Sequence, residues 1–548
     1  MEMVVKSTDL LVIGGGLAGL MSAHAAVDSG IKDITVLREG GGASTDVFGI
    51  NILGSRRVET EKDSYDTYFR DTLESGCGIN DKDLASVLVR GTEKIKEIIA
   101  RTGLGIENSE EFTFVKPLGS SYPRCAFYND KKSIGVILMA FLSQKIRDYG
   151  AREVNSVSIT HLLKDNDRVV GACGFNTKTY EQVIIKAKAT ILATGGFSNI
   201  YDFTTTFSTL NGSCHIAAYN SGAELMDLEF VQFEPCVCIY PESVRGLAIT
   251  TTMLNDGAKL YNGNKDTFIE GQYPNKNILS LAMYREIAEG RATENGGLYF
   301  DATVLEDSFI EKAYPSFITK YKKGGIDIRK NMLQVAPAAH YSCGGIRIDK
   351  DCRTSIEGLY ACGEATGGIH GANRIGGNAG AEILVFGNIA GSSSSDYISG
   401  TDLDIGDSLI KDKVEEIKIN LKNNVSCSID YGKIRKEIKS IISLSANVIR
   451  NRDSLEQGIN KLKLLKKETS LSISENSSGR DKYNYFRTES MIDIGILLLT
   501  SALKRRESRG THYRSDYRER DDKNFLGNII IKKGQEGPQL ILKEITVR

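Results

Sequence analysis

Three glycines near the N-terminus have a spacing that could hold a phosphate-bearing ligand. Gly14, Gly16 and Gly19 form a G-x-G-x-x-G motif directly after the apolar segment Leu10–Ile13 and before a run of small residues. The first glycine permits a tight turn, the second lets backbone approach a pyrophosphate, and the third allows a helix to pack closely on a strand. The start of that helix presents N–H groups and a positive dipole end to phosphate. The motif therefore predicts a dinucleotide site with contacts at Gly14, Gly16, Leu17, Ala18 and Gly19.

A carboxylate follows the second predicted strand at the distance expected for a ribose contact. The apolar segment Ile34–Leu37 leads into Arg38 and Glu39. Glu39 comes about twenty residues after the glycine motif, where a carboxylate accepts hydrogen bonds from ribose hydroxyls. A solvated surface charge is the alternative interpretation of Glu39.

The elements that must position these residues are typical of an α/β protein. Strand, glycine turn, helix and second strand make one βαβ unit, which opens a Rossmann-like doubly wound sheet. Two later segments, 190–196 and 358–364, each contain an apolar strand followed by glycine. We expect both of these strands to extend the same sheet.

Shifts in composition divide the rest of the chain. The region 235–335 is more polar and has fewer glycines, which favours an inserted α+β domain. We interpret Gly391–Ser395 as a flexible break, and Val414–Leu421 after it has the apolar spacing of a helix. The predicted arrangement is a nucleotide-binding domain in two parts, an inserted domain, and a helical C-terminal domain with a tail. Their expected bounds are 1–234 and 336–395, 235–335, and 396–548.

Bulk composition excludes several classes of function. The 548 residues carry 69 Lys and Arg against 70 Asp and Glu, so the net charge of -1 attracts neither nucleic acid nor an anionic membrane. No apolar segment is long enough to span a bilayer, and the N-terminus lacks a signal-peptide pattern. We expect a cytoplasmic protein that could reach a membrane only through partner subunits. The 10 cysteines include no C-x-x-C pair, which argues against a metal site in this chain and favours free thiols.

A cluster of charges lies near the C-terminus. Arg505 and Arg506 precede the segment Arg514–Asp522, in which basic and acidic residues alternate. A solvated tail is the favoured interpretation, and a docking surface for a partner protein is the alternative.

Five further segments occur in an order that resembles a known flavoprotein family. They are ATGG at 193–196, SGAELMDLEFVQF at 221–233, AHYSCGG at 339–345, YACGE at 360–364 with HGANRIGGN at 370–378, and SRGTHYRSD at 508–516. With the glycine motif, they resemble the succinate dehydrogenase, fumarate reductase and L-aspartate oxidase flavoprotein family, of the FAD-dependent oxidoreductase 2 type. The resemblance implies a FAD-binding domain, a capping domain at 235–335 that closes over the flavin, and oxidoreductase activity.

The resemblance also implies which residues bind FAD. Besides the glycine motif and Glu39, these are Ser44, Thr45, Gly49, Thr194, Gly195, Asp227, Glu364 and Asn378. In family members that bind FAD covalently, a histidine lies in the segment that aligns with Gly41–Asn51. That position falls on about Gly42 here, so we expect non-covalent, dissociable FAD.

The chemistry that the resemblance implies is hydride transfer between the flavin N5 and a small anionic substrate held by cationic side chains. His340 and Arg374 match two of the family's substrate positions. Arg374 offers a planar fork of donors that suits a carboxylate, and His340 can donate to the same oxyanion. A satisfied core histidine is the alternative for His340, and a structural ion pair is the alternative for Arg374.

The capping side departs from the family pattern. Glu234 stands where the family has a substrate-binding histidine, and Ser280 stands where the family has the arginine that delivers a proton. Arg285 lies five residues after Ser280, so it is not on the same helix face and is a poor substitute for that arginine. In one loop of the cap the family has a threonine, a glutamate and an arginine, and this chain keeps only the threonine, Thr250. Glu234 would repel a dicarboxylate unless it is protonated or paired, and it is also a candidate acid or base. The catalytic candidates are therefore His340, Arg374, Glu234 and Thr250.

Three hypotheses follow from this mixture. The leading one is a FAD-dependent oxidoreductase of this family with an altered anionic substrate. The second is true succinate dehydrogenase or fumarate reductase activity, with electrons exchanged through a separate iron–sulfur or other electron-transfer subunit; L-aspartate oxidase is a close variant. The third is a non-catalytic electron-transfer flavoprotein subunit.

Overall fold

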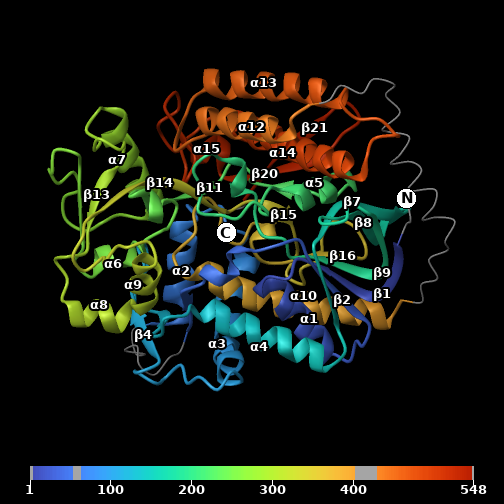
Figure 1. The fold of residues 1–548 in the computed structure, drawn as a ribbon, viewed down its shortest axis with the longest axis horizontal. Coiled ribbons are helices and arrows are strands. Elements are labelled where there is room, and N and C mark those ends of the chain that lie inside the picture. Colours follow the sequence, from blue (N-terminus) through green and yellow to red (C-terminus); the bar gives the residue numbers. More distant parts are fainter. Residues whose placement is uncertain (1–3, 54–62, 402–428, 546–548) are drawn as a thin grey trace.

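A seven-stranded sheet lies on the right side of Figure 1. The computed structural model describes residues 4–53, 63–401 and 429–545, so the predicted helical stretch Val414–Leu421 lies outside the described residues. The strand order is β6-β2-β1-β9-β8-β7, with β16 also paired to β9. These strands are β1 (Val4–Ile13), β2 (Ile34–Arg38), β6 (Arg152–Asn155), β7 (Val157–Asp165), β8 (Arg168–Asn176), β9 (Gln182–Leu192) and β16 (Leu359–Ala361).

Five of these strands run parallel, and this arrangement fixes where a ligand can bind. Strands β6, β2, β1, β9 and β16 pair in parallel, with Leu10 of β1 opposite Ile34 on one side and Ala189 on the other. Leu10, Leu11 and Val12 are fully buried, as expected for a parallel strand covered on both faces. Parallel strands end at the same edge, so the chain segments that follow β1, β9 and β16 meet there.

Helices cover the sheet, and those on the lower side in Figure 1 include α1, α4 and α10. The helices that precede residue 235 are α1 (Leu17–Asp28), α2 (Tyr65–Ser75), α3 (Lys82–Ala100), α4 (Ile134–Asp148) and α5 (Ser213–Asn220). A small sheet beside them contains β3 (Gly49–Asn51), β4 (Phe112–Val115) and β5 (Cys125–Tyr128).

The predicted flexible break at Gly391–Ser395 is wrong. These residues lie inside the 22-residue helix α10 (Asn378–Ser399). The Ser394 and Ser395 hydroxyls donate to the Gly391 carbonyl oxygen, so the serines satisfy their polar groups within the helix. Gly391 packs against α1, where an added Cβ would lie 2.1 Å from the Ser22 carbonyl oxygen. The small residues therefore serve close helix packing rather than flexibility.

The segment 235–335 forms a mixed sheet-and-helix unit at one end of the molecule, the left side of Figure 1. Its strands are β11 (Val231–Tyr240), β12 (Lys259–Tyr261), β13 (Leu298–Asp301) and β14 (Leu333–Ser342), paired in the order β11-β14-β13-β12. Its helices are α6 (Thr252–Asn255), α7 (Lys276–Ala288), α8 (Asp307–Ala313) and α9 (Pro315–Lys322). Its apolar core also includes Val115, Leu118, Cys125 and Phe127 from β4, β5 and the segment between them. The long strands β11 and β14 join the unit to the rest of the chain.

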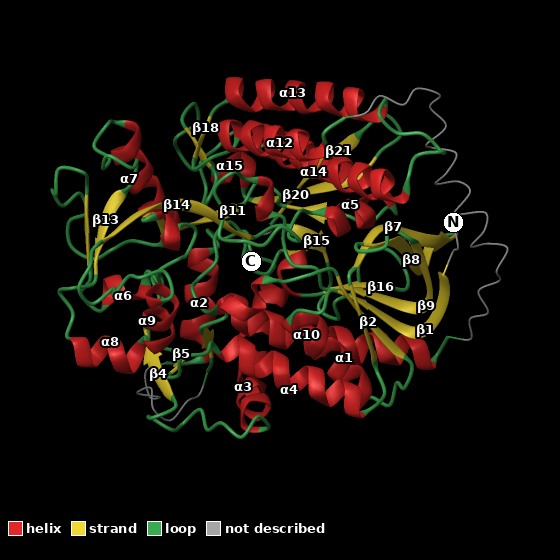
Figure 2. Ribbon diagram, in the orientation of Figure 1, coloured by secondary structure: helices red, strands yellow, loops and turns green. Residues whose placement is uncertain are grey.

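Three helices dominate the C-terminal region, at the top of Figure 2. They are α12 (Tyr431–Ser445), α13 (Arg452–Ser470) and α14 (Gly479–Lys504). The shorter elements are β18 (Ile449–Arg450), β19 (Tyr513–Arg514), α15 (Asp522–Phe525), β20 (Gly527–Lys533) and β21 (Pro538–Glu544). Strand β20 pairs with β10 (Leu225–Met226), in a sheet that also contains β15 (Gly345–Arg347) and β17 (Thr366–Gly367). The segment 527–533 is thereby joined in one sheet to strands from residues 225–226, 345–347 and 366–367.

The charged segment near the C-terminus is divided between the interior and the surface. Residues 516–520, Arg506 and Asp522 are exposed, as a solvated segment would be, whereas Arg505 and Arg514 are buried. Arg505 is fully buried, and its Nε lies 2.6 Å from Oε1 of Glu229, with Glu507 on its other side. Arg509 bonds the same Glu507 and Asp522. Because removing one partner of a buried ion pair is costly, this network ties the C-terminal segment to the segment before the cap.

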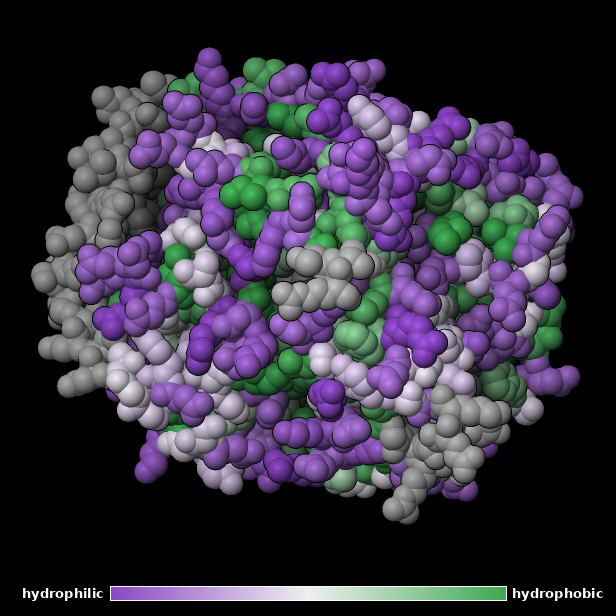
Figure 3. All heavy atoms as spheres, turned by 180° about the vertical axis from the view of Figure 1, so that it is seen from behind, coloured by the Kyte–Doolittle hydropathy of each residue, from purple (hydrophilic) through white to green (hydrophobic). Residues whose placement is uncertain are grey.

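The α/β class predicted from the sequence is confirmed by the parallel sheet and its covering helices. Among the described residues, no helix combines the length and the apolar character needed to cross a bilayer. The face opposite that of Figure 1 is covered mainly by hydrophilic residues, with scattered apolar ones between them (Figure 3).

Candidate functional site

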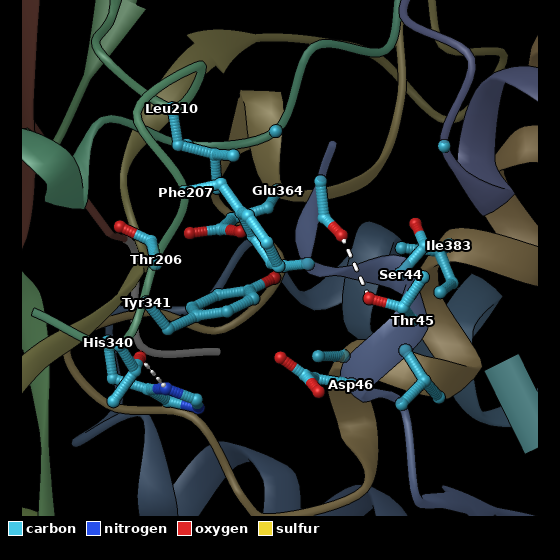
Figure 4. Close-up of a pocket in the computed structure, with 18 of the residues that line it drawn as sticks. Ser44, Thr45, Asp46, Thr206, Phe207, Leu210, His340, Tyr341, Glu364 and Ile383 are labelled. Atoms are coloured by element: carbon cyan, nitrogen blue, oxygen red, sulfur yellow. Dashed lines mark hydrogen bonds between the residues drawn. The ribbon is translucent and has the colours of Figure 1, made fainter. Parts of the chain in front are cut away.

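A cavity of about 680 Å³ lies at the carboxyl edge of the parallel sheet and reaches under the cap. The glycine turn after β1, the segment 38–49, the end of β9 and the loop 205–215 form one part of its wall. The sheet-and-helix unit at 235–335, which we call the cap, contributes residues 246–252 to the wall. Strands β11 and β14 contribute side chains to the same wall. Figure 4 shows Ser44, Thr45 and Asp46 on one side of the cavity, facing Tyr341 and His340. Its volume is within the usual range of about 300–1,000 Å³ for small-molecule and cofactor sites.

The glycine turn is shaped so that side chains are absent where a phosphate group would approach. Gly14 has φ +116°, and an added Cβ would lie 2.2 Å from the Ala193 carbonyl oxygen. At Gly16 a Cβ would lie 2.8 Å from the Ser44 hydroxyl, while at Gly19 it would lie 1.8 Å from the Gly14 carbonyl oxygen. Gly16 caps helix α1 without a side-chain cap. This is the backbone arrangement that the dinucleotide motif requires.

Most of the residues predicted to form the site line this one cavity. Those predicted to bind the cofactor and found on its wall are Gly14, Gly16, Ala18, Glu39, Ser44, Thr45, Gly49, Thr194, Gly195 and Glu364. The catalytic candidates found there are Glu234, Thr250, His340 and Arg374. Sequence positions more than 300 residues apart are therefore brought together by the sheet and the cap.

Four predicted cofactor residues lie behind the wall instead. Leu17 is buried in the core, and Gly19 supports the packing of α1 on the glycine turn. Asn378 accepts hydrogen bonds from Asn51 and from the Tyr68 hydroxyl, at 2.6 and 2.7 Å. A motif match identifies the segment near the ligand but does not tell which of its side chains face the ligand.

Asp227 is the fourth of these residues, and it belongs to the buried C-terminal network. It accepts hydrogen bonds from the Asn528 side chain at 2.6 Å and from the Ile529 backbone at 2.8 Å. Burial and the nearby Glu229 carboxylate raise the pKa of Asp227 to about 7. Its contacts hold β20 against the segment that follows β10.

Two carboxyl groups on the cavity wall are affected by burial. Burial raises the pKa of Glu39, which lies within 3.4 Å of the Tyr483 hydroxyl and is only partly accessible to solvent. Glu364 accepts a hydrogen bond from the Ser342 backbone at 3.0 Å, and burial raises its pKa to about 8. Glu364 is thus mostly protonated at neutral pH and can donate as well as accept.

Arg374 is held in place by contacts on the cavity wall. Its Nη2 donates to the Gln232 side-chain oxygen at 2.9 Å and its Nη1 to the Ile375 carbonyl oxygen at 3.0 Å. The guanidinium lies over the Tyr341 ring, 4.4 Å from the centroid. Its Nε is buried without a hydrogen-bond partner among the described residues. No carboxylate pairs with Arg374 in the described structure, which disfavours the structural ion pair considered from sequence.

His340 is an uncharged hydrogen-bonding group beside this arginine. Its Nδ1 lies 2.7 Å from the Thr205 hydroxyl, and its Nε2 lies 3.8 Å from Oε2 of Glu234. Burial, together with the positive charges of Lys276 and Arg374, holds the pKa of His340 well below 6.5. The ring is therefore neutral at pH 7 and carries one N–H donor.

Lys276 is a functional candidate that the sequence did not reveal. It lies in the first turn of α7, lines the cavity, and forms an ion pair with Glu234 in which both side chains are largely buried. Ser280, one turn later, donates instead to the Phe233 carbonyl oxygen, and Arg285 contacts Tyr513 outside the cavity. Lys276 and Ser280 are four residues apart and therefore share a helix face, so the position of Ser280 could have directed attention to Lys276.

Comparisons with known proteins agree with this arrangement. The family model described as the FAD binding domain matches residues 9–379, and that described as the fumarate reductase flavoprotein C-term matches residues 435–548. The chain is 34% identical, over 96% of its own length and 96% of the relative's, to an uncharacterized FAD-dependent oxidoreductase of Methanocaldococcus jannaschii. It is 32% identical, over 99% of its length and 100% of the relative's, to one subunit of the fumarate reductase (CoM/CoB) of Methanothermobacter marburgensis.

Solved structures share the fold over the whole chain. The E. coli quinol fumarate reductase FrdA has a TM-score of 0.86 at 24% identity, with 100% of this chain and 98% of that chain covered. The adenylylsulfate reductase of Archaeoglobus fulgidus has a TM-score of 0.78 at 18% identity, covering 100% and 97%.

The cavity fits FAD on its own geometry. Glycines stand where added Cβ atoms would strike backbone, and a helix start faces the same space. Glu39 and Glu364 offer hydrogen-bonding groups along the wall. The family matches and this fit lead to one conclusion: the chain is a FAD-dependent oxidoreductase of the succinate dehydrogenase and fumarate reductase flavoprotein family.

Proposed function

We propose that this enzyme transfers hydride between FAD and a small anionic carboxylate bound under the cap. The observation that carries the proposal is the meeting of Arg374, Lys276 and the neutral His340 in the same cavity as the glycine turn. Cationic and neutral donors held in one dry site bind a carboxylate and stabilise the negative charge that develops during reaction.

FAD supplies the hydride-accepting and hydride-donating chemistry when it is bound. Arg374 binds the carboxylate, because its position is fixed by Gln232 and Tyr341 while donor capacity remains on the guanidinium. His340 donates one hydrogen bond, with the Thr205 hydroxyl orienting its ring. Thr250, which donates to Thr252 at 3.0 Å, adds hydroxyl groups from the cap.

The cap excludes water from the proposed reaction. Apolar side chains of the cap, Leu247, Ile249 and Phe317, line the same cavity as the charged groups. Exclusion of water strengthens the electrostatic interaction of Arg374 with a bound anion.

We further infer that electrons are exchanged with a separate electron-transfer protein, and the sequence resemblance makes an iron–sulfur subunit the candidate. The relative from Methanothermobacter marburgensis is named as one subunit of its enzyme, which supports a complex of several chains here as well. Any membrane association would then pass through such partners, with the chain itself in the cytoplasm. Co-purification of the natively expressed chain, followed by iron analysis, tests this arrangement.

An anaerobic flavin-reduction screen tests the proposed function. The purified protein should be yellow, and acid precipitation should release its FAD, because no histidine lies between residues 38 and 49. We expect one or more small carboxylates to reduce the flavin, or their unsaturated forms to reoxidise dithionite-reduced flavin. Flavin that responds to no carboxylate, yet accepts electrons from a partner protein, would support a non-catalytic electron-transfer role instead.

A further inference from the structure

The charges around the proposed substrate site do not balance two carboxylates. Arg374 is always charged, whereas Lys276 and Glu234 neutralise each other as an ion pair. Lys320 and Asp46, another pair on the cavity wall at 2.9 Å, also cancel. His340 adds no charge, because burial and its cationic neighbours hold its pKa well below 6.5. This end of the cavity therefore offers one positive charge in excess.

Glu234 has an oxygen atom that still needs a donor. Its Oε2 pairs with Lys276 and faces Nε2 of His340 at 3.8 Å. Its Oε1 is buried and has no hydrogen-bond partner among the described residues, although Glu234 lines the cavity. Leaving a buried carboxylate oxygen without a partner is unfavourable, so a ligand that donates to Glu234 gains affinity.

A second substrate carboxylate could be accommodated only by breaking the pair. If Lys276 turned to the ligand, Glu234 would remain as an unpaired charge that is only 4% exposed. Breaking a buried pair in this way is strongly unfavourable, because it leaves a buried charge without compensation. If the pair stayed intact, the second carboxylate would meet the like charge of Glu234.

We propose that the substrate carries a single carboxylate, bound by Arg374, and at its other end a hydrogen-bond donor that meets Glu234. Amides, hydroxyls and amines are donors of this kind. The inference rests on the proposed function, since it concerns the substrate of that reaction, and it makes Glu234 a specificity-determining residue.

Succinamate and succinate form a matched pair of probes. They have the same shape, but in succinamate one carboxylate is replaced by an amide that donates hydrogen bonds. Binding to the FAD-loaded protein is measured by calorimetry at pH 7, with flavin content recorded first. We expect succinamate to bind at least about tenfold more tightly than succinate, because only succinate brings a second negative charge to Glu234.

The Glu234→Gln variant should close or reverse this difference, since its amide can donate to a carboxylate and Lys276 is freed for the ligand. Glu286→Gln is the matched control, because Glu286 lies on α7 and pairs with Arg291 away from the cavity. Its preference should equal that of the unchanged protein. Equal or tighter binding of succinate by the unchanged protein, or binding of neither compound, would overturn the inference, whereas a failure to hold FAD would count against the proposed function itself.

Discussion

Among single residues, Arg374 is the one on which carboxylate binding most depends. Its guanidinium is fixed by Gln232, the Ile375 carbonyl oxygen and the Tyr341 ring. Arg374→Lys keeps the charge but loses the planar fork and leaves the Gln232 oxygen without its donor. We expect kcat/KM for the active carboxylate to fall by about 100-fold, with FAD content unchanged. Steady-state kinetics test this expectation. Arg285→Lys is the control, because Arg285 contacts Tyr513 outside the cavity. Unchanged kinetics for Arg374→Lys would contradict the assignment.

Among single residues, the sequence predicted which residues occupy the site better than it predicted which side chains pair with one another. His340, Arg374 and Glu234 were predicted from motif positions, and the structure brings them together. Lys276 was missed, because the residue that aligns with the family's arginine is Ser280, which carries no positive charge. The charge lies one helical turn earlier, and only the placement of α7 against β11 brings it to Glu234. The unpaired Oε1 of Glu234 is equally invisible without coordinates.

At the scale of elements, the packing of α10 on α1 connects small residues to the cofactor site. Helix α1 begins at the glycine turn, so a displacement of α10 reaches the cavity wall. Gly391→Val places a side chain against the Ser22 carbonyl oxygen, 2.1 Å from the added Cβ. We expect the free energy of unfolding to fall by roughly 1–3 kcal/mol, with weaker FAD retention. Denaturant unfolding measures this, and Gly400→Ala at the open end of α10 should change little; equal stability of the two variants would show that the contact is unimportant.

The same helix shows why element boundaries escaped sequence reasoning. A glycine followed by four serines has the composition of a linker, yet its hydroxyl groups bond within α10 and its small volume suits the contact with α1. The βαβ unit was predictable because strand, glycine spacing and helix are all local signals. The pairing of β20 with β10 was not, since it joins segments about 300 residues apart.

At the scale of the whole molecule, stability should depend on pH through carboxyl groups that are buried in neutral form. The pKa of Glu364 is raised by burial from 4.5 to about 8, so the folded protein binds a proton that the unfolded chain releases above pH 4.5. The stabilisation is complete below that value and is lost as the pH rises towards 8. Asp227, whose pKa burial raises to about 7, acts in the same direction.

The Glu364→Gln variant isolates this contribution. A neutral amide needs no proton, so the stability of the variant relative to the unchanged protein should increase by roughly 1 kcal/mol per pH unit between pH 5 and 8 and then level off. Denaturant unfolding of the FAD-free protein at each pH measures the difference. The exposed Glu97→Gln on α3 serves as the control and should give a constant difference. A Glu364→Gln difference that is flat across this range would mean that Glu364 is ionised in the folded protein, and the net charge of the cavity wall would then be more negative by one.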